Sequence, residues 1–540
     1  MLAPMMETPL LISSLMEFGV TNHPRAEIVS RRVEDGSIHR TTQLEAARRT
    51  RQLANALLNW GVKPGDRIAT LAWNTWRHYE AYYATAGIGS ICHTINPRLF
   101  PEQLDYIFNH AEDRMVFVDL NLLPLVEGLI DKLPKLEAVV VMTERAHMPA
   151  SKLDKLICYE DFIADHSDQF DWPQFDENTP CSLCYTSGTT GNPKGVLYTH
   201  RSTVLHALGS LHAQALDIKA DSVILPVVPM FHVNAWGIPY AVTITGAKLV
   251  FPGAAMDGAS LWELIRDEQP TLLAGVPTIW LGLLNHLDDI GERLDSVQTV
   301  VVGGSAAPLS MIRAFDEKHD AFLLHAWGMT EMSPIGTVNA PTKALLSLPK
   351  EQRYKKQLKQ GKPVFGVDIK IIDDQGAELP RDGKAYGRLM VRGPWIVNSY
   401  YKSDKLATED GWFDTGDVAT IDPENYIQIV DRSKDVIKSG GEWISSIDLE
   451  NIAVGHEAVA EACVIGIPHE KWQERPLLLV VLKKGAKATR EDILDFLKPQ
   501  LASFWLPDDV VFRDDLPHTA TGKLLKVPLR EEYANHYIGQ

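Results

Sequence analysis

The sequence predicts an α/β protein with a large N-terminal domain and a small C-terminal domain. The chain has 540 residues, which is too long for a single hydrophobic core. Helix-like and strand-like segments alternate over about the first 430 residues, as expected for helices layered on largely parallel sheets. From about residue 436 the pattern starts again on a smaller scale. We therefore expect a compact α+β unit of roughly 100 residues at the C-terminal end.

Within the large domain, the first clear helix is predicted to begin after Thr42, because Thr42 and Glu45 have the spacing of a capping box. Apolar residues recur at helical spacing as far as Trp60, and Gly61 supplies a stop signal. A turn at 63–66 then leads into a strand. The predicted strands are 67–71, 115–119, 138–142, 248–251, 271–275 and 299–302.

In the small domain, the pattern predicts helices at 446–454 and 490–501, strands at 462–465 and 477–482, and then a short tail. The two blocks are separated by the polar run 431–435, which lacks glycine and proline. On sequence alone this run is typical of a solvated connector.

Composition and charge narrow the possible functions. The chain is 45% hydrophobic and 23% charged, as in ordinary globular proteins. A net charge of −17 disfavours nonspecific binding to nucleic acid. No apolar run approaches the roughly 18 residues that a membrane helix needs. The first basic residue is Arg25, so the N-terminus lacks the positive region of a signal peptide, and we expect a cytoplasmic protein.

The five cysteines do not have the pattern of a disulfide framework. Cys181 and Cys184 are spaced as in redox or zinc sites. However, no second cysteine pair or histidine pair follows at metal spacing, and the pair begins an expected strand. We interpret both thiols as packing residues.

The segment 185–196 is the most informative part of the chain and reads YTSGTTGNPKGV. Small residues allow a backbone to wrap closely around a ligand and to point its N–H groups at phosphate oxygens. Hydroxyls add donors or a metal ligand, and Lys194 adds positive charge. A flexible linker would not need this lysine, proline and hydroxyl content. The segment is not a Walker A loop, because Gly195 follows Lys194 where that motif has Ser or Thr.

This segment resembles the signature loop of the adenylate-forming superfamily, which includes acyl-CoA synthetases, luciferases and peptide-synthetase adenylation domains. The resemblance extends over essentially the whole chain. It implies a β-barrel-like part in the large domain and a mobile small domain. The expected domains are residues 1–434 and 435–540, with Asp435 as the hinge.

Further motifs resemble those of the same superfamily. In WGMTE, residues 327–331, the resemblance places Trp327 beside adenine, Thr330 at a nucleotide phosphate and Glu331 at Mg²⁺. Most members have tyrosine where Trp327 stands, and the larger ring should reshape the adjoining acyl pocket. A turn at Gly303 and Gly304 follows the strand 299–302 and resembles the wall beside adenine and the acyl group.

Four other segments complete the resemblance. The loop 229–237 places His232 near the adenylate and its following residues along the acyl tunnel. The motif TGD makes Asp417 the ribose anchor, with Arg432 as a cationic contact. The segment 438–443 resembles a slot for the pantetheine arm of coenzyme A, and its WISS continuation is similar to that of fatty-acyl-CoA ligases. Near the end of the chain, Lys523 matches the catalytic lysine that neutralises charge on the carboxylate and α-phosphate.

The resemblance therefore implies a defined set of site residues. Catalytic roles fall to Lys523, Glu331, Thr186 and His232, and Mg²⁺ would be held by Thr186 and Glu331. The acid would contact His232, Val233, Trp236, Gly303, Pro308 and Trp327. ATP and coenzyme A would contact Thr186, Ser187, Gly188, Thr189, Thr190, Lys194, Gly303, Gly304, Trp327, Gly328, Met329, Thr330, Asp417, Arg432, Lys434, Lys438, Gly440, Gly441 and Trp443.

The expected activity is that of an AMP-forming acyl-CoA ligase that uses ATP, Mg²⁺ and coenzyme A and acts as a homodimer. The segment 91–98, ICHTINPR, resembles the group of ligases for medium-chain fatty acids and 3-methylmercaptopropionate. Both acids are apolar and unbranched, so the motifs do not separate them. The alternatives are an aryl-CoA ligase, a luciferase-like oxygenase and a non-catalytic acyl or nucleotide sensor. A sensor could dispense with Lys523 and Glu331, and both are present.

Overall fold

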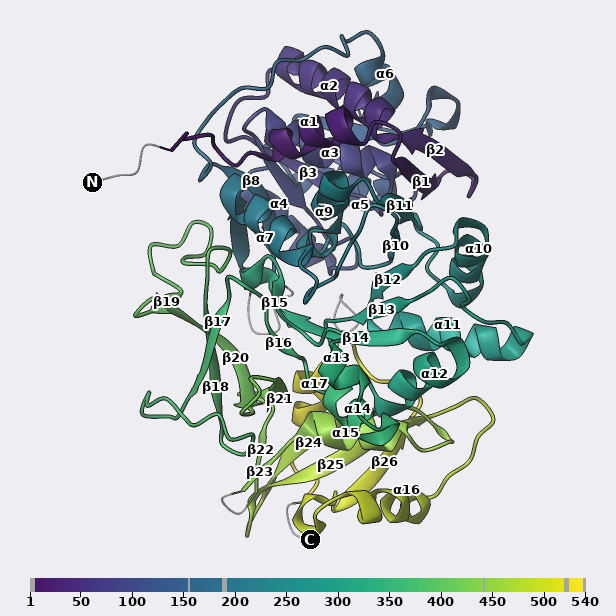
Figure 1. Cartoon of the computed structure of the whole chain (residues 1–540), viewed down its shortest axis with the longest axis vertical. Helices are drawn as coiled ribbons and strands as arrows, with labels where there is room; N and C mark the ends of the chain where they lie inside the picture. Colours follow the sequence, from purple (N-terminus) through teal and green to yellow (C-terminus); the bar gives the residue numbers. More distant parts are fainter. Residues whose placement is uncertain (1–4, 154–155, 187–191, 440–441, 519–523, 538–540) are drawn as a thin grey trace.

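A computed structural model of the chain describes residues 5–153, 156–186, 192–439, 442–518 and 524–537. Among these residues the strands form four sheets. Figure 1 shows the N-terminal segments and the C-terminal unit at opposite ends of the long axis, with the middle of the chain between them. The large N-terminal and small C-terminal domains that the sequence predicts are thus both present.

Two sheets of mainly parallel strands form the framework of the large domain. The nine-stranded sheet has the order β16 (Lys362–Pro363), β15 (Ile335–Val338), β14 (Phe322–Gly328), β13 (Thr299–Val302), β12 (Leu272–Gly275), β10 (Val223–Pro226), β11 (Lys248–Phe251), β1 (Glu27–Arg31) and β2 (Ile38–Thr42). The seven-stranded sheet has the order β7 (Leu156–Cys158), β6 (Ala138–Val141), β5 (Met115–Val118), β3 (Arg67–Leu71), β4 (Ile91–Thr94), β8 (Pro180–Tyr185) and β9 (Gly195–Thr199). The strands β2, β9, β15 and β16 pair antiparallel at the edges.

Helices cover both sheets on both faces. They are α1 (Ile12–Asn22), α2 (Gln43–Trp60), α3 (Trp76–Gly87), α4 (Pro101–Ala111), α5 (Leu123–Leu129), α6 (Tyr159–Ala164), α7 (His200–Ser210), α8 (Val233–Trp236), α9 (Ile238–Thr245), α10 (Gly258–Glu268), α11 (Pro277–Ile290), α12 (Leu309–His319), α13 (Lys343–Leu346) and α14 (Lys350–Gln357). One buried cluster joins α1, α3, α7 and α9 to strands of both sheets, so these helices lie between them.

The remaining faces are covered separately. Helices α10, α11 and α12 pack on the outer face of the nine-stranded sheet. On the seven-stranded sheet, Met115 and Phe117 of β5 face α2 and α6, whereas Val116 and Val118 face α4 and α5. This alternation follows from the two-residue period of a strand and explains the continuous apolar run in the sequence.

A third, antiparallel sheet supplies the barrel-like part of the large domain. It consists of β17 (Asp368–Ile372), β18 (Tyr386–Arg392), β20 (Trp412–Ile421) and β19 (Thr408–Glu409), with β21 (Ile427–Arg432) paired to β20. Its apolar residues belong to the same buried cluster as the central helices.

The small domain contains a sheet of β23 (Glu442–Ile444), β22 (Ile437–Ser439), β25 (Gln473–Leu482) and β24 (Val459–His469), with β26 (Asp509–Arg513) paired to β25. Its helices are α15 (Ser446–Val454), α16 (Arg490–Leu497) and α17 (Lys526–Glu532). Separate buried clusters on the two faces of this sheet give the unit its own core.

Local signals placed several elements correctly. Helix α2 begins at a capping box formed by Thr42 and Glu45 and ends at Gly61, where φ is 101°. Two expectations were wrong. The segment expected to be a short C-terminal tail contains β26 and α17. β26 pairs with β25, and α17 packs against residues that are distant in sequence. The run 431–435 is not simply solvated, because Asp431 is only 2% exposed.

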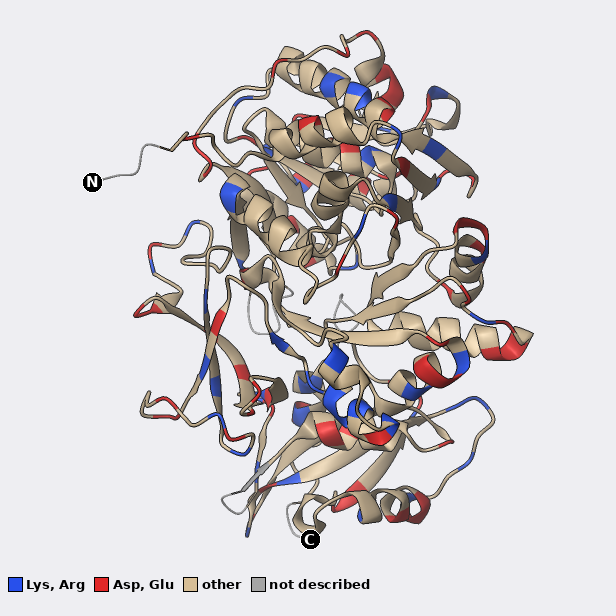
Figure 2. Cartoon of the chain, in the orientation of Figure 1, with Lys and Arg blue, Asp and Glu red and all other residues tan. Residues whose placement is uncertain are grey.

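In the view of Figure 2 the charged residues are spread along the chain, and basic residues are concentrated around α14. Many of them are paired there with acidic residues, as in the Lys350–Asp316 contact of 2.9 Å. Cys181 and Cys184 are buried free thiols whose pKa values are raised by desolvation, which agrees with a packing role. Across the described helices, none combines the length and apolar character needed to cross a bilayer.

Gly361 joins the nine-stranded sheet to the barrel-like sheet, and its substitution tests this architecture. Its φ is +88°, and a Cβ atom there would lie 2.0 Å from the carbonyl carbon of Val338 in β15. Gly376 has a similar φ of +86° but no atom within 4 Å of its would-be Cβ. We expect Gly361→Ala to lower the melting temperature and soluble yield strongly. Gly376→Ala should cost only the conformational strain, roughly 1–3 kcal/mol. Equal melting temperatures for the two variants would contradict the close approach.

Candidate active site

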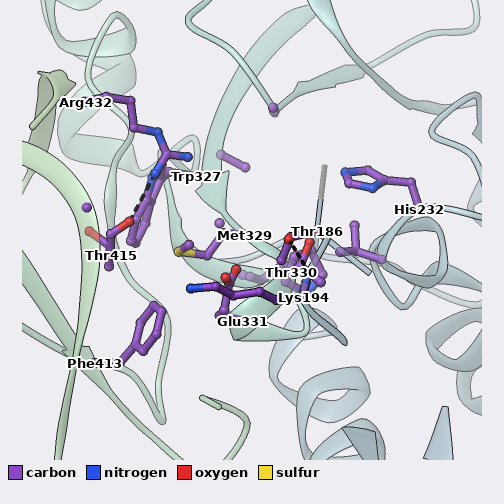
Figure 3. A pocket seen from close by; sticks show the side chains of 18 of the residues that line it. Thr186, Lys194, His232, Trp327, Met329, Thr330, Glu331, Phe413, Thr415 and Arg432 are labelled. Carbon is purple, nitrogen blue, oxygen red and sulfur yellow. Dashed lines mark hydrogen bonds between the residues drawn. The ribbon is translucent and has the colours of Figure 1, made fainter. Parts of the chain in front are cut away.

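Most of the described site residues that the sequence predicts line a cavity of about 540 Å³ beside the ends of β13 and β14. Ligands of parallel α/β sheets bind at the carboxyl ends of strands. The cavity is lined by Thr186, Asn192, Lys194, Leu216, His232, Val233, Trp236, Val301, Gly303, Gly304, Ala326, Trp327, Gly328, Met329, Thr330, Glu331, Pro334, Ile335, Tyr400, Phe413, Asp414, Thr415, Gly416, Arg432, Ser433, Lys434, Asp435, Leu524, Leu525, Lys526 and Val527. In Figure 3, His232 lies on one side of Thr186 and Thr330, with Trp327 and Arg432 on the other.

The turn after β14 positions Thr330 and Glu331. A Cβ atom at Gly328 would lie 1.9 Å from the carbonyl oxygen of Pro334, so only glycine fits this crossing. The buried Tyr198 hydroxyl donates a hydrogen bond to the Thr330 carbonyl at 2.6 Å. Tyr400 donates to Glu331 Oε1 at 2.8 Å and fixes that carboxylate. Sequence reasoning did not identify Tyr198 or Tyr400, because neither belongs to a motif that names a hydroxyl partner.

Asp417 is held by donors from two sheets. Trp327 Nε1 donates to its Oδ2 at 3.0 Å, and Arg432 Nε contacts its Oδ1 at 3.0 Å. Arg432 also donates from Nη1 to the Thr415 carbonyl at 3.1 Å. Asp417 and Arg432 are direct partners in the β20–β21 ladder, which explains why residues 15 positions apart meet. The arrangement presents a fixed, buried carboxylate suited to accepting hydrogen bonds from neighbouring hydroxyls.

The two ends of the glycine-rich segment are clasped together. The Thr186 N–H donates to the Lys194 carbonyl at 2.9 Å, and the Lys194 N–H donates to Thr186 Oγ1 at 3.1 Å. The Lys194 ammonium lies 4.7 Å from the ring centroid of Tyr400, an arrangement that orients the cation. Ser187, Gly188, Thr189 and Thr190 lie outside the described residues.

The apolar side of the cavity is built on an unusual turn. Residues Val233 to Trp236 all have positive φ, between 43° and 57°. Such left-handed conformations are costly for residues other than glycine. The buried Asn234 side chain anchors the turn by donating to Ser182 Oγ at 3.1 Å. Its anchoring was not apparent from sequence, because Ser182 is 52 residues away.

This turn places Trp236 against a glycine. A Cβ atom at Gly303 would lie 3.0 Å from the Trp236 ring, so the indole packs directly on the backbone there. Trp236, Val233 and Trp327 line the cavity together with His232. The described lining thus combines a flat apolar end with a polar end around Glu331.

The segment at the expected domain boundary and a segment near the end of the chain also reach the cavity. Arg432 to Asp435 and Leu524 to Val527 are part of its lining. Asp435 donates its backbone N–H to the Arg432 carbonyl at 2.8 Å and pairs with Arg530 at 2.6 Å. Lys523 immediately precedes Leu524 but lies outside the described residues.

Some predicted residues lie elsewhere. Pro308 lines a second cavity of about 320 Å³ with Asp417, Trp327 and Gly304, apart from His232 and Trp236. Lys438 is exposed on β22, and it lines neither of these two cavities. Gly440, Gly441 and the side chain of Trp443 lie outside what the structure describes.

The cavity suits a metal cation that is coordinated mainly by a bound substrate. Among the described residues no group of three His, Cys, Asp or Glu side chains could bind a metal alone. Mg²⁺ commonly takes one or two carboxylates together with substrate phosphates and water. Glu331 and the hydroxyl of Thr186, both lining the cavity, fit that donor set.

Comparisons with known proteins agree with this geometry. A family model described as AMP-binding enzyme matches residues 17–401, and one described as AMP-binding enzyme C-terminal domain matches residues 448–523. The chain is 51% identical over 541 residues to 3-methylmercaptopropionyl-CoA ligase of Ruegeria lacuscaerulensis, with 100% of both chains covered. It is 48% identical over 537 residues to medium-chain-fatty-acid–CoA ligase of Ectopseudomonas oleovorans, with 99% of this chain and 98% of the relative covered.

The fold has solved counterparts. A crystal structure of an anthranilate CoA ligase in complex with anthranoyl-AMP has a TM-score of 0.86 and 26% identity, covering 97% of this chain and 98% of that one. The predicted fold class is therefore confirmed for both the large and the small domain.

The contact between Trp327 and Asp417 can be tested by Trp327→Phe, which keeps a flat ring but removes the N–H donor. Hydrogen bonds to charged groups contribute about 1.5–3 kcal/mol, so the Kd for ATP should rise roughly 10-fold or more. Isothermal titration calorimetry measures this change. Trp412→Phe on β20, the strand of Asp417, is the control, since Trp412 lies instead beside Lys370 and Arg392. Equal ATP affinity in the wild type and Trp327→Phe would exclude the proposed anchoring.

Proposed function

Because the chain belongs to the AMP-binding enzyme family, we propose that it is an AMP-forming acyl-CoA ligase for short or medium-chain acids. The carboxylate oxygen attacks the α-phosphorus of ATP, forming an acyl-adenylate and releasing pyrophosphate. The coenzyme A thiol then attacks the acyl carbonyl carbon, forming the thioester and releasing AMP. The observation that carries the proposal is one cavity in which the clasped loop, the Thr330–Glu331 turn, Arg432 and the 524–527 segment meet, with Asp417 bound to two of the lining residues, Trp327 and Arg432.

In the first step, residues on the walls of the two cavities bind ATP and neutralise its charge. Asp417 accepts the ribose hydroxyls, and Trp327 packs beside adenine. Lys194 and Thr330 face the phosphates, and cations at Arg432, Lys434 and Lys526 counter the overall charge of −17. Positioning and charge neutralisation of this kind are the main contributions a protein makes to phosphoryl chemistry.

Two groups complete the adenylation site in the proposal. Mg²⁺ bound by Glu331 and Thr186 would supply further charge neutralisation to the phosphates. Lys523 supplies an ammonium group to the reacting carboxylate and α-phosphate, and His232 lies on the carboxylate side. The lining by Leu524 and Leu525, which directly follow Lys523, supports this assignment.

The second step uses a different face of the small domain. We assign residues 1–434 to the large domain and 435–540 to a mobile domain that turns about Asp435. Lys438, Gly440, Gly441 and Trp443 would then contact the pantetheine arm. Lys438 lies outside both cavities in the present arrangement, which is consistent with separate faces for the two steps.

Substrate choice follows from the apolar end of the cavity. Trp236 and Trp327 bring two large rings to the wall, so a short or medium unbranched chain fits better than a long one. The relatives named for 3-methylmercaptopropionyl-CoA and medium-chain fatty acids support acids of this class. We include 3-methylmercaptopropionate and alkyl acids as substrates. The homodimer and the cytoplasmic location expected from sequence are also retained as proposals.

The activity is tested by measuring acid-dependent release of AMP and pyrophosphate over a panel of acids. The panel contains alkyl acids of rising length, a thioether acid and aryl acids, each with and without coenzyme A. We expect coenzyme A thioesters of short and medium unbranched acids. Preference for aryl acids would favour the aryl-CoA ligase, and an oxygen-dependent product would favour the oxygenase. No AMP release with any acid would favour the sensor.

Lys523→Ala separates the two steps. It should reduce pyrophosphate release by 100-fold or more, on the order of losing one preorganised charge at the reacting atoms. Conversion of supplied acyl-adenylate and coenzyme A to the thioester should be largely spared. Lys487→Ala, at an exposed loop position of the small domain, is the matched control. An equal loss in both steps would argue against a role confined to adenylation.

Trp236→Ala tests the acyl wall. Removing the indole should deepen the apolar end and raise kcat/KM for longer acids relative to short ones by roughly 10-fold or more, since a poorly accommodated methylene costs about that factor. The KM for ATP should change little. Trp236→Phe should give an intermediate profile, and Trp472→Ala in the small domain is the control. An unchanged length profile in both Trp236 variants would remove Trp236 from the acyl wall.

A further inference from the structure

A buried carboxylate at the end of β21 is bound mainly by residues of the proposed small domain. Asp431 is 2% exposed. Its Oδ2 accepts hydrogen bonds from the backbone N–H of Ser446 at 2.9 Å and from the Ser446 hydroxyl at 2.6 Å. Ser446 is the first residue of α15, so the negative charge lies at the positive end of that helix. Buried carboxylates need such donors. The Arg432 N–H donates to Oδ1 at 2.8 Å from the same strand, whereas both donors to Oδ2 come from beyond the hinge at Asp435.

A neighbouring hydrogen bond connects the same two elements. The Ser445 hydroxyl donates to the Val430 carbonyl at 2.6 Å, and Ser445 also caps α15 by accepting from the Asp448 N–H at 3.1 Å. Val430 and Asp431 precede the hinge, whereas Ser445 and Ser446 follow it. Three hydrogen bonds therefore dock the N-terminus of α15 on the last residues of β21.

Lys526 links this contact to the active-site cavity. Its ammonium lies 2.7 Å from Glu450 Oε1 and is hydrogen-bonded to the Ser446 hydroxyl. Glu450 is held in turn by the Val464 N–H at 2.8 Å. Desolvation raises the pKa of Asp431, and the Lys526 ammonium opposes that rise. Lys526 and the two leucines before it also line the cavity.

We propose that Asp431 is a positioning residue that docks the small domain in the arrangement used for adenylation. This inference rests on the proposed function. Ser446, Glu450 and Lys526 belong to one domain and keep their mutual contacts when it rotates, whereas Asp431 belongs to the other domain. The bonds from Ser446 to Asp431, like the bond from Ser445 to Val430, therefore exist only while α15 is docked.

The contact has the properties of a reversible one. Asp431 Oδ2 is hydrogen-bonded to Ser446 when α15 is docked, and water takes over these bonds when α15 leaves. The net stabilisation is consequently much smaller than the direct interaction in a buried site. By contrast, the Asp435–Arg530 pair joins two residues of the small domain and does not distinguish the arrangements.

Asp431→Asn keeps the shape of the side chain and removes the charge. We expect the kcat of adenylation, measured by pyrophosphate release with saturating acid and ATP, to fall about 10-fold or more, as for loss of a charge-assisted hydrogen bond. The KM values for acid and ATP should change little, because Asp431 lines only the smaller cavity and its Oδ2 is bound to Ser446. Thioester formation from supplied acyl-adenylate and coenzyme A should be unchanged or faster.

Asp422→Asn is the matched control. Asp422 is 8% exposed and binds Lys359 at 2.6 Å, but both residues lie in the large domain. Ser446→Ala should lower adenylation by a smaller factor, since its backbone N–H remains. In the double variant Asp431→Asn with Ser446→Ala, the adenylation rate should fall by less than the product of the two separate factors, because the two side chains share one bond.

Two outcomes would overturn the inference. One is an unchanged adenylation rate in Asp431→Asn. The other is an equal fall of both steps with a lowered melting temperature, which would show a role in folding only. Asp431→Glu retains the charge and should recover part of the adenylation rate. If Asp431 had a role in folding only, this variant would not recover it. Failure of the proposed function itself is recognised separately, because the wild type would then release no pyrophosphate with any acid.

Discussion

The contact of Asp417 with Trp327 and Arg432 connects three strands of two sheets. Trp327 is the penultimate residue of β14 in the nine-stranded sheet, Asp417 lies on β20 of the barrel-like sheet, and Arg432 is the last residue of β21 in that same sheet. The nucleotide side of the cavity therefore depends on the relative placement of two sheets that are folded from distant segments. Three residues after Arg432 the chain reaches Asp435, so the same contact also fixes the point from which the small domain extends.

Much of the fold could be predicted because its signals are local. The capping box at Thr42 and Glu45, the left-handed Gly61 and the apolar runs of buried parallel strands each act within a few residues. The strand β26 and the helix α17 could not be placed in this way. Their stability comes from pairing with β25 and from packing against residues such as Ile465 and Leu477, which are distant in sequence.

The candidate site likewise contains some residues that local motifs predict and others that depend on distant contacts. Motif residues such as Glu331 and Thr186 could be identified from sequence, and the structure brings them to one cavity. The residues that orient them could not, because Tyr400 reaches Glu331 across 69 positions and Asn234 reaches Ser182 across 52. Asp431 illustrates the limit most clearly. A polar run suggests solvent, but burial depends on which donors the fold supplies, and those donors lie on a helix 15 residues away.

The left-handed turn at Val233 to Trp236 has a consequence for how such a pocket diversifies. Asn234 points into the core and holds the backbone, whereas Trp236 points into the cavity, so support and shape are assigned to different side chains of one turn. Exchange of the cavity-facing ring leaves the supporting bond intact and leaves Asp417, which lines the second cavity, untouched. Single substitutions can thus change which acid is preferred, and substrate range can diverge while the nucleotide contacts are retained.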